Sequence, residues 1–266
     1  MDTGEYLELL YKKYHKPQYI PPDPLEFPRK YSNREDREIV ALIASSLAMG
    51  RVSGIKKAVD SVLTPLSSPR EALLNISEGE FKKLYRNFSY RFFRGEHISA
   101  LLTGIAETIR EYGTLESCFM EGYLKSQKSG SENLFPALER FVRILSKKSG
   151  GDMGFILPAP EKGGACKRLN LFLRWMVRSD SVDPGGWVEL NPSALLVPLD
   201  THMLKNGRAL GLTSRRQADR KTTLEITESF RKFDPEDPVR YDFSLTRLGI
   251  HPTVRSRDNP FMPAGF

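Results

Sequence analysis

Hydrophobic residues recur at helical spacing along most of the chain. In the segment "REDREIVALIASSLAMG", one face of a helix collects Ile39, Leu42, Ile43 and Leu47, and Asn33 occupies the N-cap position. The segments "GIKKAVDSVL", "NLFPALERFVRILSKKSGG" and "TTLEITESFRKF" repeat this spacing. No segment alternates between polar and apolar residues regularly enough to predict a sheet. The pattern therefore predicts an all-α fold.

Capping and helix-breaking residues mark the ends of several predicted helices. Ser77 and Glu80 form a capping-box pair at the start of "SEGEFKKLYRNF". The helix in "HISALLTGIAETIREYG" is expected to stop at Gly113. In "DPVRYDFSLTRLGI", Pro238 suits the first helical position, so the last helix is expected to begin there.

The charge of the chain favours an anionic partner. Its 266 residues include 40 Lys and Arg against 33 Asp and Glu, which gives a net charge of +7. Nucleic acid is the commonest partner of a basic protein. The basic residues recur in pairs through the chain and do not form a tail, which indicates a folded basic surface.

The sequence also argues against several classes of protein. Cys118 and Cys166 provide no disulfide framework, so a cytoplasmic location is expected. The first residues lack a signal-peptide pattern and no apolar run is long enough to span a membrane, so no membrane partner is expected. The histidines and cysteines show no metal-ligand spacing, and no glycine-rich phosphate loop is present. Neither a metal nor a nucleotide cofactor is therefore expected, and an enzyme of this kind would use a carboxylate or an amine.

One candidate for such chemistry is Lys167, in "GGACKRLNLFLRWMVR". The apolar residues of this segment follow helical spacing, and Lys167 lies in the first turn of the predicted helix. The positive end of the helix dipole disfavours an ammonium group there, and desolvation would lower the amine pKa further, which would make a usable nucleophile. On this local pattern alone, a solvated basic residue is the commoner role. A solvated face is also open for Arg168, Arg174 and Arg178.

The second candidate is Asp200, in "PLDTHMLKNGRALGLT". It fits the N-cap of a helix that Gly211 closes. Capping is the commoner role for such an aspartate. The two roles are compatible, because a capping carboxylate is held rigidly, stays ionised and can stabilise an oxocarbenium-like transition state beside a sugar.

These two segments occur in an order that resembles the helix-hairpin-helix (HhH-GPD) superfamily of DNA glycosylases. "KRLNLFLR" is similar to that family's lysine helix, and "PLDTHMLKNGRALGLT" is similar to its aspartate segment. Upstream, "EIVALIASSLAMGRVSGIKKA" resembles an early helix pair, and downstream "RYDFSLTRLGI" resembles the closing helix. The chain is also similar to an uncharacterised bacterial family with the same "PLDTHM…LGLT" signature, which by itself implies no function.

The resemblance implies a base-excision DNA repair glycosylase with AP lyase activity. Lys167 matches the Schiff-base lysine and Asp200 the catalytic aspartate. Two helical lobes are implied, one formed by residues 37–185 and the other by 1–36 together with 186–266, with damaged duplex DNA and a flipped base between them.

Three departures bear on the substrate. The family's hairpin is replaced by "LPAPEKGGA", and no glutamine stands near Ala48 and Met49, where relatives often carry one that wedges into the duplex. The interval between Lys167 and Asp200 is 200 − 167 = 33 residues, which is longer than in most members. A long interval is shared with the archaeal 8-oxoguanine glycosylases, so an oxidised base such as 8-oxoguanine is the expected substrate.

The resemblance also suggests roles for three further residues. Trp187 is a candidate for stacking on the base, with core packing between the lobes as an equal alternative. Asp242 could accept a hydrogen bond from a base N–H, although a surface or capping role is commoner. His202 completes the substrate-binding set, with a structural hydrogen bond as the favoured role.

Backbone contacts with DNA are expected from a second group of residues. Gly163 and Gly164 would let the backbone approach a phosphate at the start of the lysine helix. Arg168 and Arg51 are also expected on the DNA backbone. The protein is expected to be a monomer, and the alternative function is a non-catalytic nucleic-acid-binding module on the same helical scaffold.

An aromatic segment, "FSYRFFRG", stands apart from these motifs. Core packing is the favoured interpretation for its aromatic residues, and the interleaved arginines are candidates for phosphate contacts. The residues concerned are Phe88, Tyr90, Arg91, Phe92, Phe93 and Arg94.

Overall fold

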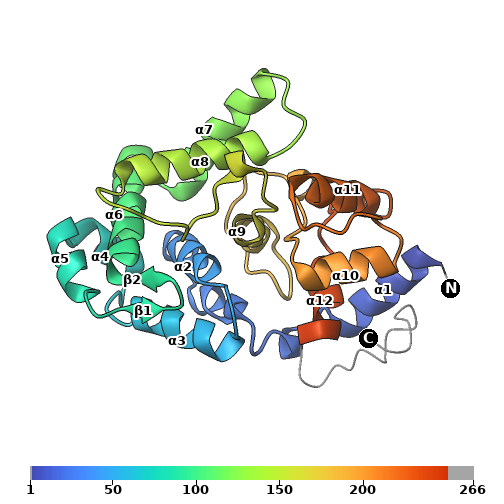
Figure 1. Ribbon diagram of the computed structural model, residues 1–266, viewed down its shortest axis with the longest axis horizontal. Helices are drawn as coiled ribbons and strands as arrows, with labels where there is room; N and C mark the ends of the chain where they lie inside the picture. The colour runs from blue at the N-terminus through green and yellow to red at the C-terminus, as the bar shows by residue number, and fades with distance from the viewer. Residues whose placement is uncertain (1, 251–266) are drawn as a thin grey trace.

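The computed structural model describes residues 2–250 and has the all-α fold that the sequence predicts (Figure 1). The exception within these residues is a hairpin of two short antiparallel strands, β1 (Ser89–Tyr90) and β2 (Phe93–Arg94). The α-helices are α1 (Thr3–Tyr14), α2 (Arg34–Ser46), α3 (Val52–Leu63), α4 (Pro69–Asn75), α5 (Glu78–Leu84), α6 (Gly95–Tyr112), α7 (Leu115–Lys128), α8 (Phe135–Lys148), α9 (Lys167–Val177), α10 (Thr201–Ala209), α11 (Arg220–Arg231) and α12 (Asp242–Ile250). Short 3₁₀ turns connect several of them.

Several helix boundaries follow the predicted capping residues. The Asn33 side chain accepts hydrogen bonds from the first-turn amides of α2, and Ser77 and Glu80 form a complete capping box on α5. The last helix begins later than predicted, at Asp242 and not at Pro238. The reason is local: the Arg240 amide bonds to the carbonyl of Asp237 and the Asp242 amide to that of Val239, so this stretch forms tight turns.

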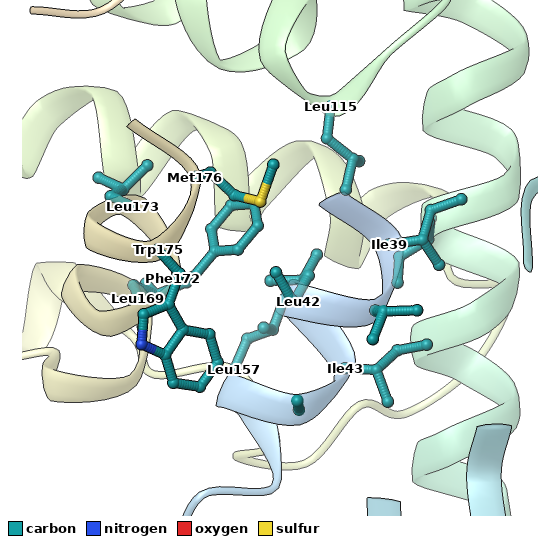
Figure 2. Close-up of a cluster of buried hydrophobic side chains, with 14 of the residues drawn as sticks. Ile39, Leu42, Ile43, Leu115, Leu157, Leu169, Phe172, Leu173, Trp175 and Met176 are labelled. Atoms are coloured by element: carbon teal, nitrogen blue, oxygen red, sulfur yellow. The ribbon is translucent and has the colours of Figure 1, made fainter. Parts of the chain in front are cut away.

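The larger of two hydrophobic cores is centred on α2 and α9. Figure 2 shows the apolar face of α9, with Phe172 and Met176, directed at Leu42 and neighbouring residues of α2. The helices α6, α7 and α8 pack around this pair on one side (Figure 1). Because α2 is buried from Glu38 to Ser46 and packs against α9, it is the central support for Lys167 at the start of α9.

A second core joins the beginning of the chain to its last helices. α1 packs against α12, and α12 packs against α10, around Tyr6, Phe230 and Tyr241 (Figure 1). Residues 20–27 and 187–196 contribute to the larger core, although the sequence-based division grouped them with the termini. Residues 251–266, grouped with this second lobe in the same division, lie outside the described residues. Among the helices described, none combines the length and apolarity needed to cross a membrane.

Candidate active site

The structure brings the two candidate catalytic residues together. The Lys167 Nζ lies 2.8 Å from the Asp200 Oδ2. Each residue belongs to a helix start: Lys167 is the first residue of α9, and Asp200 is the N-cap of α10, where its Oδ1 accepts a hydrogen bond of 2.8 Å from the Met203 amide. The predicted helix cap and the predicted catalytic carboxylate are therefore the same group. Its Oδ1 caps α10, and its Oδ2 pairs with Lys167.

A cavity of about 610 Å³ opens beside this pair. Its volume suits a nucleobase with its sugar, since ligand sites of roughly 300–1,000 Å³ are usual for molecules of that class. The residues that line it come from the α2–α3 connection, α3, α9, α10 and α12. They include Met49, Gly50, Arg51, Lys167, Leu171, Asp200, Thr201, His202, Asp242, Thr246 and Arg247. The amine is about one-third exposed and the carboxylate is 17% exposed, so both can be reached from the cavity.

The Asp200 carboxylate is ionised in this setting. Burial raises the pKa of Asp200, but the Lys167 ammonium and the Met203 amide outweigh burial, and the pKa lies below its ordinary value. An ionised carboxylate that is already fixed in position can accept a proton or stabilise a developing cation without rearrangement.

Asp242 lies in the buried floor of the cavity. Its Oδ2 accepts a hydrogen bond from the Arg174 guanidinium, while its Oδ1 has no hydrogen-bond partner among the described residues. Burial raises the pKa of Asp242 above its ordinary value despite Arg174. The surface or capping role expected as the commoner one is wrong, because this carboxyl is buried against the cavity.

Below the cavity, α9 contributes two buried arginines to an ion network. Arg174 binds Asp183 with two hydrogen bonds, of 2.8 and 3.2 Å, and Arg178 donates to the same aspartate at 2.7 Å. Arg178 also donates to Asp237, which precedes α12. The solvated face considered for these arginines is wrong, because carboxylates from the loop after α9 and from residues 237–242 cover them.

Arg247 was not identified from the sequence. It is buried, lines the cavity and pairs with Asp23 at 2.8 Å. The sequence signal was weak, because Asp23 precedes the first predicted helix and nothing local joins it to α12.

His202 and Arg51 lie at the cavity, as a substrate or DNA contact requires. Both are exposed, His202 in the first turn of α10 and Arg51 at the N-cap of α3. The His202 ring also sits against Gly249 of α12, where an added Cβ would come within 2.8 Å of its Nδ1. This close approach ties α10 to α12 at the cavity wall.

Trp187 is away from the cavity and fills the core. It is 4% exposed, packs on Phe119 and Phe172, and donates a hydrogen bond of 2.8 Å from its Nε1 to Glu38. The stacking role predicted for Trp187 is therefore corrected to core packing, because no face of the indole is free for a base.

Two of the predicted DNA-backbone contacts are also corrected. The Gly163 amide donates to the carbonyl of Pro160, so it is already used within a turn. The Arg168 guanidinium donates to the carbonyls of Ser46, Phe155 and Ile156 at 2.6–2.7 Å, and burial lowers its pKa to about 10. Arg168 therefore fixes the loops around Lys167 instead of facing a phosphate.

Gly164 remains compatible with a close approach of backbone to a ligand. It is exposed, and nothing lies within 4 Å of the position that a Cβ would take. Cys166, which follows two residues later, is a poor candidate for chemistry, because burial raises the pKa of its thiol to about 11. Within residues 2–250, no group of three or more His, Cys, Asp or Glu side chains is placed to hold a metal ion.

Comparison with known proteins identifies a family. A family model described as "Protein of unknown function (DUF2400)" matches residues 23–251. No curated protein and no solved structure matches the chain. The matched segment contains Lys167, Asp200 and the whole lining of the cavity.

Proposed function

The chain belongs to the DUF2400 family of proteins of unknown function, and we propose that it is a DNA repair glycosylase with AP lyase activity. One observation carries this proposal: the Lys167 amine and the Asp200 carboxylate, 2.8 Å apart, meet beside a cavity that can hold a nucleoside. An amine paired with a base is the arrangement needed for nucleophilic catalysis by lysine. The resemblance to HhH-GPD glycosylases supports the same reaction.

The proposed first step replaces the glycosidic bond. The Lys167 amine attacks C1′ of the flipped nucleoside, the C1′–N bond breaks, and the base leaves with the bonding electrons and takes up a proton. While the base leaves, the negative charge of Asp200 stabilises the cationic sugar. Once Nζ has bonded to C1′, Asp200 accepts the proton that the nitrogen gives up. Opening of the sugar ring then yields a Schiff base between Nζ and C1′.

The lyase step follows from the Schiff base. Loss of a proton from C2′ sends electrons toward C3′, where the C3′–O bond breaks and the 3′ phosphate departs. This elimination nicks the strand, and hydrolysis of the remaining Schiff base frees Lys167. Asp200 is within reach of the amine at both stages, so one carboxylate can serve the proton transfers.

The substrate is proposed to be an oxidised purine such as 8-oxoguanine. Asp242, with one carboxyl oxygen unpartnered at the floor of the cavity, supports recognition of a base that presents an N–H group. The base must leave the stack to reach this floor, at a cost of a few kcal/mol. The net charge of +7 and the exposed Arg51 at the cavity favour binding of the DNA strand.

Borohydride trapping tests the proposal. The protein is incubated with duplex oligonucleotides that carry 8-oxoguanine or an abasic site, and reduction should give a covalent adduct that Lys167→Ala abolishes. Lys221→Ala is the matched control, because Lys221 also lies in the first turn of a helix but is exposed on α11. It should leave the adduct intact.

Two outcomes would contradict the proposal. If the wild-type protein forms no adduct with a panel of damaged bases and abasic DNA, the lyase activity is absent. Binding without lesion preference, weakened steeply by salt and only slightly by Lys167→Ala, would instead identify a non-catalytic nucleic-acid-binding module.

A further inference from the structure

Two exposed phenylalanines meet on the surface next to the cavity. Phe92, at the tip of the β1–β2 hairpin, is 59% exposed, and Phe155, in the loop before α9, is 50% exposed. Their ring centroids are 5.7 Å apart, and the fully buried Phe93 supports Phe155 at 5.2 Å. The core-packing interpretation of this segment is right for Phe93 and wrong for Phe92. We name Phe92, Phe155 and Arg91 the aromatic patch.

The turn of the hairpin is locally unfavourable for these residues. Tyr90 pairs with Phe93, so the connection consists of Arg91 and Phe92 alone. Arg91 takes a φ of +53°, in a position where two-residue hairpins favour glycine or asparagine. Neither turn residue contributes to the core, and the large ring of Phe92 is left in solvent. Departures from the usual turn residues and from the burial of large apolar side chains occur mostly at functional sites.

The aromatic patch is fixed to the wall of the cavity. The Tyr90 hydroxyl donates a hydrogen bond of 2.7 Å to the carbonyl of Met49, and Met49 lines the cavity. Gly50, with a φ of +109°, allows the Arg91 guanidinium to approach, since an added Cβ would lie 2.8 Å from its Nη1. On the other side, Arg168 holds the carbonyl of Phe155 at 2.7 Å and directly follows Lys167 in α9. The hairpin also lies beside α3 (Figure 1).

The surroundings of the aromatic patch are basic. Residues 39–59 and 81–95 contain no aspartate or glutamate, and the acidic residues that border the patch along the chain are Glu96 and Asp152. Arg51, Arg91 and Arg94 are exposed, and no carboxylate among residues 2–250 forms an ion pair with any of them. An exposed aromatic ring flanked by unpaired arginines matches a polyanion with stacked bases, and it does not match a basic or purely apolar surface.

We propose that the β1–β2 hairpin is a wedge that inserts Phe92 into the base stack of duplex DNA, next to the nucleotide that occupies the cavity. Phe155 supports the inserted ring from the side, and Arg91 and Arg94 contact the flanking phosphates. The inference rests on the proposed function for the identity of the nucleotide in the cavity. It adds the requirement for a duplex, because a single strand has no opposite stack to hold open.

The experiment compares Phe92→Ala and Phe92→Trp with the wild-type protein on the same abasic site in duplex and in single-stranded DNA. Adduct formation on the duplex should fall roughly tenfold or more in Phe92→Ala, while the rate on the single strand stays within about twofold, and tryptophan should restore the duplex rate. Phe233→Ala is the matched control, because Phe233 is an exposed phenylalanine outside the cavity and the patch. Since Phe92 is largely solvent-exposed, none of these variants should alter folding.

A second readout does not depend on chemistry. Duplex DNA with a stable abasic analogue beside 2-aminopurine should become more fluorescent on binding as the stack opens, and Phe92→Ala should lose this signal. Wild-type unstacking without any adduct would overturn the proposed lyase and leave the wedge standing. Equal adduct rates for wild type and Phe92→Ala on the duplex would overturn the wedge and leave the lyase standing. A patch that serves a protein partner would give unchanged unstacking in Phe92→Ala, and a wild type that neither binds nor unstacks would overturn both.

Discussion

Lys167 and Asp200 form an ion pair of 2.8 Å although each begins a different helix and 33 residues separate them. The carboxylate uses one oxygen for the Met203 amide and the other for the lysine. Capping therefore does not compete with chemistry at this residue. It fixes the carboxylate in the orientation that the amine requires, and a substitution can separate the two tasks.

Asp200→Asn is expected to abolish most of the adduct-forming activity while the protein remains folded. Asparagine caps a helix about as well as aspartate, so the free energy of unfolding should change by about 1 kcal/mol or less. The neutral amide cannot take a proton from Lys167 or stabilise a cationic sugar, so the trapping rate should fall roughly 10²-fold or more. Single-turnover trapping together with urea unfolding measures both quantities.

The control for this variant is Asp219→Asn. Asp219 caps α11 in the same way, accepts a hydrogen bond of 2.8 Å from the Thr222 amide, and lies outside the cavity lining. It should leave the trapping rate unchanged. Equal losses of activity in both variants would mean that helix capping, and not the charge of Asp200, controls the reaction.

The buried aspartate beneath the cavity predicts a large effect on stability. Asp183 has no exposed surface and accepts hydrogen bonds from both Arg174 and Arg178. Asp183→Asn leaves these arginines with too little negative charge, so the free energy of unfolding should fall by about 3–5 kcal/mol. Urea denaturation followed by circular dichroism measures the change.

A surface substitution of the same type sets the baseline. Asp60 is exposed on α3, and within the part of the chain that the structure describes its carboxylate forms no ion pair. Asp60→Asn should change the free energy of unfolding by no more than about 0.5 kcal/mol. A loss below about 1 kcal/mol in Asp183→Asn would mean that the ion network adds little to stability.

Local signals explain which parts of this structure could be predicted. The caps at Asn33, Ser77 and Asp200 act within one helical turn, so the sequence is sufficient to recognise them. The burial of Arg174 could not be predicted in this way, because its covering carboxylates, Asp183 and Asp242, come from a loop and from the last helix.

The same reasoning explains why the sequence leaves two roles open for Trp187 and predicts the wrong one for Phe92. A tryptophan after two glycines predicts an exposed loop, but the buried Glu38 of α2 supplies a partner for its indole N–H that no local pattern reveals. In "FSYRFFRG", Phe92 lies in the two-residue turn of the hairpin and is exposed, whereas Phe93 begins β2 and is buried. Which of the two is buried depends on the side from which α6 and the loop before α9 approach.

Glu38 predicts an unusual dependence of stability on pH. Burial raises the pKa of this carboxyl to about 7, against hydrogen bonds from the Leu115 and Glu116 amides and the Trp187 indole that lower it. The folded protein therefore binds more protons than the unfolded chain between about pH 4.5 and 7. The contribution of Glu38 to stability is full below this window and is lost as the pH rises through it, by roughly 3 kcal/mol in total.

Glu38→Gln should remove this dependence. The glutamine amide cannot ionise, so the variant should keep the stability that wild type loses between about pH 5 and pH 8. The free energy of unfolding of the variant minus that of wild type should therefore rise by roughly 2–3 kcal/mol over this range. At pH 5 the free energy of unfolding of the variant should be lower than that of wild type. The reason is that an N–H group of the new glutamine side chain would point at the Leu115, Glu116 or Trp187 N–H donors. Glu35→Gln, near the exposed start of α2, should keep the wild-type slope. A parallel slope in Glu38→Gln and wild type would show that another group titrates.

Two glycines in helices predict opposite effects of the same substitution. An added Cβ at Gly104 of α6 would lie 2.6 Å from the carbonyl oxygen of Leu145, so α8 would have to move away. At Gly79 of α5, nothing lies within 4 Å of that position. Gly104→Ala should lower the free energy of unfolding by about 1–3 kcal/mol. The neighbouring atom is a backbone oxygen of α8, which cannot move aside as the end of a flexible side chain can. Gly79→Ala should raise it by roughly 0.5–1 kcal/mol through helix propensity. Urea unfolding of both variants checks the pair, and a gain at Gly104 would mean that α6 and α8 do not pack at this distance.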